Sequence, residues 1–224
     1  MSRITALHVS KGRGHRVNVF LDGKFAFSVG SKVVSREGLQ PEQELTVEQI
    51  ETLVITDRHE RGLATALRYL AYRPRSKAEL KERLQQRGFD TDTQEKVISK
   101  LQQQGLLNDT EFAEYWTDNR QSFSPRSRRL TKMELERKGV DRDIINRTVS
   151  SIDDESSAYR AAITHAMTLL RYDHDNHDRF FRRLGAYLQR RGFDHDVIRH
   201  TVENLWTNRE SLSNEVQAGL GRSI

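Results

Sequence analysis

The chain has 224 residues, a net charge of +5, no cysteine and a mean hydropathy of −0.76. The lack of cysteine excludes disulfides, thiolate catalysis and cysteine-type zinc sites, and no apolar stretch approaches the length of a membrane span. The first residues are basic and include no apolar run, so we expect no secretory signal and a cytoplasmic protein without a cofactor.

The first 57 residues predict a small β-rich module. Val, Ile and Phe dominate Ile4–Val9 and Val17–Val29, and Asp22-Gly23 stands where a two-residue hairpin turn would join two strands. Short helices are predicted at 31–37 and 47–53. Because a sheet of two or three strands is marginal by itself, we expect this module to pack on the helical chain that follows.

A phrase that occurs three times dominates the rest of the chain. The sequence from Leu84 to Asp90, with Gly88 near its end, recurs from Leu135 to Asp141 and from Leu188 to Asp194, and its glycines are 51 and 53 residues apart. Basic residues, then a glycine, then an Asp are typical of a helix that ends in the left-handed conformation before the next helix is N-capped. The phrase therefore predicts three tandem three-helix repeats.

Apolar residues follow each phrase at matching positions. Eight and eleven residues after each Asp stand aliphatic side chains: Ile98 and Leu101, Val149 and Ile152, Val202 and Leu205. This spacing places them on one face of the third helix of each repeat. The first repeat has Thr93 and Gln94 where the others have two aliphatic residues, so we expect it to pack differently there.

The predicted fold is mainly α: three tandem three-helix repeats in an elongated array, preceded by a small segment that contains a β-hairpin. We expect helices near 59–72, 77–87, 92–104, 109–121, 126–138, 142–151, 155–171, 178–191 and 195–207. The predicted domains are 1–57, 58–107, 108–152, 153–207 and a tail, 208–224. No exposed apolar patch recurs with the repeat, so we expect a monomer. A single irregular helical domain with a chance repetition is the alternative.

Basic residues gather in the segment that leads into each phrase. Seven basic and two acidic residues lie between Arg68 and Arg87, seven and two between Arg120 and Lys138, and five and none between Arg179 and Arg191. If the repeats stack regularly, these windows form a ladder along one side, which is typical of a protein that binds a polyanion. The alternative is that each window is an ordinary solvated helix face.

The basic ladder comprises twelve candidate residues for binding a polyanion such as DNA or an acidic protein surface: Arg73, Arg75, Lys77, Lys81, Arg126, Arg128, Arg129, Lys132, Arg179, Arg182, Arg183 and Arg190. We favour the five at predicted helix starts, where positive charge opposes the macrodipole: Arg75, Lys77, Arg126, Arg128 and Arg129. Charge reversal at the last three should leave the fold intact. The basic residues beside the glycines are expected to be structural: Arg87, Lys138 and Arg191.

The sequence contains no recognisable nucleophile, nucleotide or metal motif. His and Asp alternate in 172–178, but this segment lacks the central Gly and the final Glu of a calcium loop. We interpret it as a polar loop between helices, with a weak metal site as the alternative. Trp116 and Trp206 fall at apolar helix positions and are expected in the core. The chain is predicted not to be an enzyme and to have no catalytic, metal or cofactor site.

Three segments resemble the RecX regulators of the bacterial recombinase RecA: Arg75–Leu84, Gly105–Ala113 and Arg128–Val140. The resemblance covers residues 58–207, and the first 57 residues resemble the N-terminal segment of the longer members of that family. It implies a non-enzymatic protein that binds RecA and the RecA–DNA filament along the helical groove, and that limits recombinase activity and the SOS response. The basic ladder would then face filament-bound DNA or an acidic RecA surface.

Two other functions stay open at this point. The first is a sequence-nonspecific DNA-binding protein built from helix-turn-helix-like repeats. It is disfavoured because the three candidate recognition-helix starts are unlike one another: 91–94, 142–145 and 195–198. The second is a metal-dependent nuclease at 172–178, which would need several carboxylates around one ion.

Overall fold

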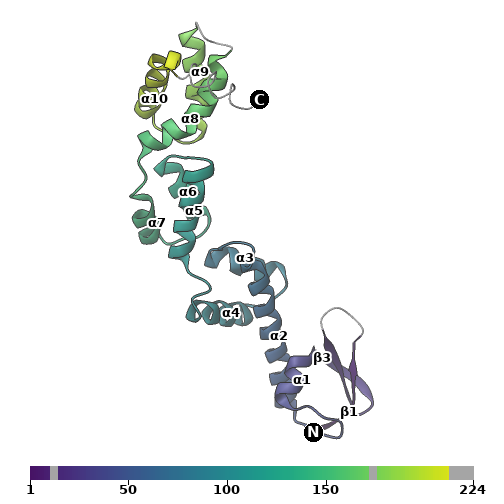
Figure 1. Ribbon diagram of the computed structural model, residues 1–224. Coiled ribbons are helices and arrows are strands. Elements are labelled where there is room, and N and C mark those ends of the chain that lie inside the picture. Colours follow the sequence, from purple (N-terminus) through teal and green to yellow (C-terminus); the bar gives the residue numbers. More distant parts are fainter. Residues whose placement is uncertain (11–14, 172–175, 212–224) are drawn as a thin grey trace. The chain divides into compact units, whose positions relative to one another are not determined.

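The computed structural model describes residues 1–10, 15–171 and 176–211, and it is mostly helical (Figure 1). The chain divides into two compact units, Met1–Arg73 with Leu80–Leu107 and Pro74–Glu79 with Asn108–Ile224. Separate clusters of buried apolar side chains lie in the N-terminal module and in each three-helix repeat. The chain is therefore mainly α with a small β-containing segment at its N-terminus, as predicted.

The N-terminal module contains a four-stranded antiparallel sheet of order β3-β2-β1-β4. Its strands are β1 (Ser2–Val9), β2 (Arg16–Leu21), β3 (Lys24–Gly30) and the short β4 (Glu44–Leu45). Asp22 and Gly23 join β2 to β3, which confirms the predicted hairpin. The core of the module combines buried side chains of the sheet with Val33 of α1 (Ser31–Glu37) and Leu53 of the following helix.

One long helix, α2 (Val47–Leu70), takes the place of the two helices predicted at 47–53 and 59–72. It begins with a capping box in which Thr46 and Gln49 exchange side-chain-to-backbone hydrogen bonds. No Gly or Pro occurs between its start and residue 61, so the helix continues through the predicted domain boundary at residue 57. Asp57 lies buried at that point and accepts hydrogen bonds from Arg16 and from the N–H of Gly30.

Each repeat consists of three helices. The second half of α2 is followed by α3 (Lys77–Gln86), α4 (Thr91–Gln103), α5 (Asp109–Phe123), α6 (Arg128–Arg137), α7 (Arg142–Val149), α8 (Asp154–Leu170), α9 (His177–Arg190) and α10 (His195–Thr207). From α3 onward, the helix ends agree with the predicted ones to within two residues. The difference matters at α6, which begins after the N-cap Ser127, so that Arg126 precedes the helix.

The recurring phrase ends one helix in every repeat. Gly88, Gly139 and Gly192 have φ of 78°, 71° and 85°. This left-handed conformation is open to glycine without steric cost and is strained for residues with a Cβ. The predicted helix-ending role of the three glycines is therefore confirmed.

The Asp of the phrase caps the next helix in two of the three repeats. Asp90 accepts a hydrogen bond from the N–H of Thr93, and Asp141 caps α7 in the same way. The bonds from Thr93, and then the one from Arg58, lower the pKa of Asp90 to about 2. Asp194 stands at the same position before α10 but makes no side-chain cap hydrogen bond. The predicted N-cap position is therefore confirmed in the third repeat, but the side-chain hydrogen bond expected of it is absent.

The predicted apolar faces are buried in all three repeats. The buried residues at the two recurring offsets are Ile98, Leu101, Val149, Ile152, Val202 and Leu205. In the first repeat, Thr93 and Gln94 are buried as well. Thr93 packs against Gly62 of α2, where a Cβ would lie 3.0 Å from its methyl carbon. Gln94 donates to the carbonyl of Phe89 at 2.7 Å, so this polar pair packs through a close helix approach and an internal hydrogen bond.

Two helix starts in the unit that contains residues 74–79 and 108 onward are hydrogen-bonded to the end of a later helix. The hydroxyl of Ser76, before α3, donates to the carbonyl of Lys138 at 2.7 Å. The N–H of Ser127, before α6, donates to the carbonyl of Arg191 at 3.1 Å. A glycine of the phrase follows each carbonyl and marks the end of its helix. Each helix start is therefore hydrogen-bonded to the end of a later helix.

Backbone donors complete both contacts. The N–H of Lys77 donates to the carboxylate of Asp109 at 2.8 Å, and the N–H of Arg128 donates to that of Asp154 at 2.7 Å. Each carboxylate belongs to the first residue of a later helix, α5 or α8. The first N–H groups of a helix lack intrahelical partners, so these carboxylates satisfy donors that would otherwise need water.

Candidate functional site

The structure places the ladder residues in three different surroundings. Arg73 and Arg75 lie half buried in the connection between α2 and α3, where both take part in contacts. Lys77 and Lys81 are exposed on α3. Within this first group, the two lysines are therefore the members that face solvent.

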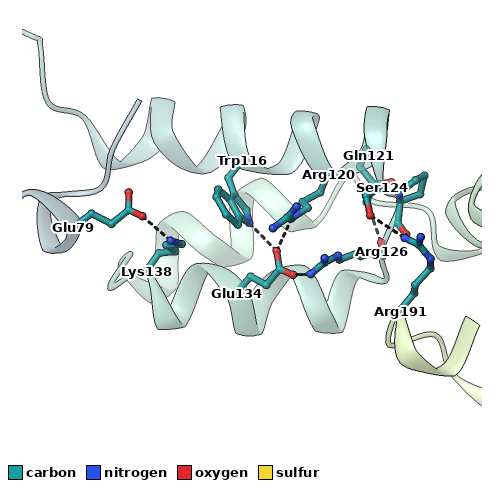
Figure 2. Close-up of polar contacts among 10 residues, drawn as sticks. Glu79, Trp116, Arg120, Gln121, Ser124, Arg126, Glu134, Lys138 and Arg191 are labelled. Carbon is teal, nitrogen blue, oxygen red and sulfur yellow. Dashed lines mark hydrogen bonds and ion pairs between the residues drawn. The ribbon is translucent and has the colours of Figure 1, made fainter. Parts of the chain in front are cut away.

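Arg126 lies within the second repeat, where it pairs with Glu134 (Figure 2). The side chain of Glu134 is 11% exposed and that of Arg126 is 29% exposed. Burial, and then the charges of Arg120 and Arg191, lower the pKa of Arg126, although arginine remains a cation in proteins. Reversing this charge would bring a second carboxylate to Glu134. Contrary to the expectation from sequence, we therefore expect reversal at Arg126 to destabilise the fold.

Glu134 also holds two side chains of α5. It accepts hydrogen bonds from Trp116 Nε1 and from Arg120 Nε, each at 2.9 Å, and Figure 2 shows both side chains projecting from α5 toward it. Arg120 and Lys138 lie 4.5 Å and 4.9 Å from the centre of the Trp116 ring, within the range of cation–π attraction. Lys138 pairs with Glu79 at 2.6 Å. Trp116 and Lys138 are therefore structural, as predicted.

Three ladder residues of α6 line one cleft of about 630 Å³: Arg128, Arg129 and Lys132. The Arg129 side chain is 63% exposed, and its guanidinium lies 4.0 Å from the carboxylate of Asp194. Lys132 donates to the side chain of Asn146 at 2.9 Å. These contacts leave further N–H donors on both cations, so an anionic group that enters the cleft can be bound by both.

Arg128 has a more structural position in the same cleft. Its guanidinium donates to the carbonyl of Ile152 through Nε at 3.2 Å and through Nη2 at 2.5 Å. Asp154 and Asp194 also line the cleft, and the sequence indicated them only as residues at helix starts. No feature of the sequence places these carboxylates beside the ladder, because their approach depends on where the starts of α8 and α10 lie relative to α6.

The third group lies on α9, where all four ladder residues are exposed: Arg179, Arg182, Arg183 and Arg190. Arg191, which follows the helix, donates to the hydroxyl of Ser124 at 2.9 Å and to the carbonyl of Pro125 at 3.3 Å. Arg191 is therefore structural, as predicted. Arg87, the corresponding residue beside the first glycine, is exposed.

Residues 172–175 of the predicted polar loop lie outside the described residues, so neither interpretation of that loop is tested. Across 1–10, 15–171 and 176–211, no group of three or more His, Asp or Glu side chains is placed to hold a metal ion. No helix in this described part is long and apolar enough to cross a membrane. Trp206 packs against the core of the third repeat, as predicted.

Three family models match the chain. The N-terminal domain of Regulatory protein RecX matches residues 2–46, and the first and second three-helix domains of RecX match 63–101 and 108–149. A Regulatory protein RecX of Clostridium perfringens (strain 13 / Type A) is 30% identical over 215 residues, which cover 95% of this chain and 100% of the relative. That of Bacillus subtilis (strain 168) is 31% identical over 217 residues, covering 96% and 82%.

Solved structures show the same fold. A crystal structure of a regulatory protein RecX aligns with a TM-score of 0.64 at 24% identity and covers 91% of this chain and 100% of that one. The crystal structure of RecX from Lactobacillus salivarius aligns with a TM-score of 0.58 at 26% identity, covering 67% and 97%. Three matching domain models and relatives that are similar over nearly the whole chain lead to one conclusion: this chain belongs to the RecX family of regulatory proteins.

Proposed function

We propose that this chain binds the recombinase RecA and the RecA–DNA filament and limits recombinase activity and the SOS response. Membership of the RecX family carries this proposal, because its relatives are named regulatory proteins. The same proposal makes it a monomeric cytoplasmic protein that acts in DNA repair without a cofactor. A pull-down with purified RecA in the absence of nucleic acid tests it directly. A chain that retains no RecA there, but binds DNA in a separate assay, would favour the alternative, a nonspecific DNA-binding protein.

The cleft on α6 is the part of the basic ladder that best supports binding of a polyanion. Arg129 and Lys132 are neighbours on one helix face, and both retain donors for an additional anionic group. Arg126, by contrast, already has a carboxylate partner in Glu134. We therefore assign the binding role in the second repeat to Arg129 and Lys132.

Replacing both Arg129 and Lys132 with Glu is expected to weaken binding to the RecA–DNA filament roughly tenfold while leaving the melting temperature near that of the wild type. Fluorescence anisotropy with labelled filament measures the affinity. If the cleft meets DNA phosphate, the variant should also show a flatter dependence of affinity on salt concentration. If it meets acidic RecA side chains, binding to RecA without DNA should weaken equally.

The double variant Arg142→Glu with Arg147→Glu is the matched control. It changes the net charge by the same amount in the same repeat, at exposed positions of α7 that lie outside the ladder. We expect it to bind the filament like the wild type. An equal loss of affinity in both double variants would mean that total charge, rather than the cleft, governs binding.

We also expect no catalytic turnover by the purified chain. Neither ATP hydrolysis nor cleavage of DNA should appear with magnesium, manganese or zinc, as measured by phosphate release and by gel electrophoresis. Metal-dependent cleavage that disappears in Asp173→Asn or His174→Gln would contradict this prediction and support the nuclease alternative.

A further inference from the structure

Three aromatic rings lie side by side across the N-terminal sheet. They belong to His8 of β1, Phe20 of β2 and Phe25 of β3, which come from adjacent strands. The ring centres of His8 and Phe20 are 4.9 Å apart, and those of Phe20 and Phe25 are 5.9 Å apart. The three side chains therefore form a continuous row, which we call the aromatic row.

The aromatic row lies on the face of the sheet that points away from the core of the module (the outer face). Val19 of β2 is buried in that core, so its neighbours Asn18 and Phe20 point to the outer face. His8 is paired with Asn18 in the register of the sheet and therefore shares this face. Phe25 shares it too, because it is paired with Phe20. Phe25 is 59% exposed, His8 is exposed and Phe20 is half buried, so a ligand can contact the row from solvent.

The three strands that carry the row are basic. They contain Arg3, Arg16 and Lys24 and no acidic residue. Arg3 and Arg16 have carboxylate partners elsewhere in the chain. Lys24, which directly precedes Phe25, is exposed and makes no ion pair with another described residue. Its flexible side chain is therefore available to an anionic group that is bound beside Phe25.

Polar side chains share the outer face with the row. Asn18 and Ser28 are paired in register, and the amide of Asn18 offers both donors and an acceptor. The hydroxyl of Ser28 accepts from Arg16 and keeps its own hydrogen to donate. Exposed rings, hydrogen-bonding side chains and a cation suit the faces of bases, the edges of bases and a phosphate. A purely apolar protein surface would leave Asn18 and Lys24 without partners.

We propose that the aromatic row is a stacking platform for the unpaired bases of single-stranded DNA, with Lys24 contacting a phosphate of the same strand. An aromatic ring stacks on any of the bases, because every base has a π-face. In a duplex, neighbouring base pairs cover those faces, so the platform selects a single strand. Stacking releases no counterions, so this part of the affinity changes little with salt concentration.

The inference goes beyond the proposed function, because it gives the N-terminal module a contact with DNA that is independent of RecA and of the basic ladder. Only the choice of DNA over RNA rests on the proposed function, in which the chain acts on a filament that contains DNA. Single strands of both nucleic acids carry unpaired bases, and both would stack on the row by the same chemistry.

The test measures binding of the full chain to a fluorescein-labelled oligothymidylate by fluorescence anisotropy. Phe25→Leu and His8→Leu each replace a ring with an aliphatic side chain at an exposed position. We expect each variant to bind about fivefold more weakly than the wild type, because the contact with one stacked base is lost. Phe25→Tyr and His8→Phe keep a ring, so their affinity should stay within about twofold of the wild type.

A strand of the same length whose bases are replaced by abasic sites separates stacking from phosphate contacts. It keeps every phosphate, so we expect the wild type to bind it about fivefold or more weakly than oligothymidylate. Phe25→Leu should bind the abasic strand as the wild type does, because no base remains to stack on the ring. Duplex DNA of the same length should likewise not distinguish Phe25→Leu from the wild type.

Phe123→Leu is the matched control. It also removes an exposed phenylalanine ring, since Phe123 is 84% exposed at the end of α5 and lies outside the sheet. We expect this variant to bind oligothymidylate like the wild type. Circular dichroism melts verify that each variant is folded. Because Phe25 and His8 are exposed, we expect melting temperatures near that of the wild type.

Several outcomes would overturn the stacking platform. They are unchanged affinity of Phe25→Leu and His8→Leu for oligothymidylate, an equal loss on the abasic strand, or a loss that Phe123→Leu shares. If Phe25→Leu weakened binding to RecA without nucleic acid, but not to oligothymidylate, the row would be a protein interface instead. Tighter binding of oligouridylate than of oligothymidylate would reassign the row to RNA. A wild type that binds no oligothymidylate also rejects the platform, while the RecA pull-down still decides the proposed function independently.

Discussion

Replacing Gly192 with Ala is expected to lower the free energy of unfolding by about 3 kcal/mol, from two separate costs. The first is strain, because φ at this position is 85°. The second is overlap, because a Cβ would lie 2.7 Å from both Leu130 Cβ and Ser127 Oγ. Ser127 is the N-cap of α6, so the α6 start would have to move away from the end of α9. Urea denaturation followed by circular dichroism measures the change.

Gly88→Ala separates the two costs. Its φ is 78°, yet a Cβ there would meet nothing within 4 Å, so we expect a loss of only about 1 kcal/mol. Gly139→Ala should resemble the Gly192 variant, since its Cβ would lie 2.5 Å from that of Ala78. Equal losses at Gly88, Gly139 and Gly192 would mean that the close contacts at the last two contribute nothing.

Replacing Glu134 with Gln is expected to destabilise the protein by about 3 kcal/mol, because it removes one partner from a largely buried charge cluster. Arg126 and Arg120 would retain their positive charges in half-buried positions without this carboxylate. The melting temperature and the denaturant midpoint should both fall. A loss below about 0.5 kcal/mol, the ordinary range for a surface substitution, would contradict the structural role given to Glu134.

Two comparisons sharpen this prediction. Trp116→Phe removes one neutral donor to Glu134 and keeps most of the ring, so it should cost about 1 kcal/mol. The double variant of Glu134→Gln with Arg126→Gln should be less destabilised than the sum of its two single variants, because each residue is costly only while the other retains its charge. Strict additivity would show that the two residues do not interact.

The places where helices end were predictable because local chemistry decides them. Gly88, Gly139 and Gly192 adopt the left-handed conformation that the phrase predicts, and the aliphatic residues that follow at fixed offsets are buried. Helix periodicity and the tolerance of glycine for positive φ act over a few residues, so a single sequence carries them in full. The same holds for the hairpin at Asp22-Gly23. The elongated array and the domain boundaries stay predictions.

The roles of individual basic residues depended on tertiary structure. Sequence treats Arg126 and Arg129 alike, yet Arg126 pairs with Glu134 whereas the side chain of Arg129 is 63% exposed beside a cleft. The difference arises because Arg126 lies within reach of Glu134, whose carboxylate also accepts hydrogen bonds from Trp116 and Arg120 of α5. Charge pattern along a sequence therefore predicts no more than a basic protein that binds an anionic partner. Which cations remain available for such a partner depends on the packing of helices, because packing determines which carboxylates come within reach of each guanidinium.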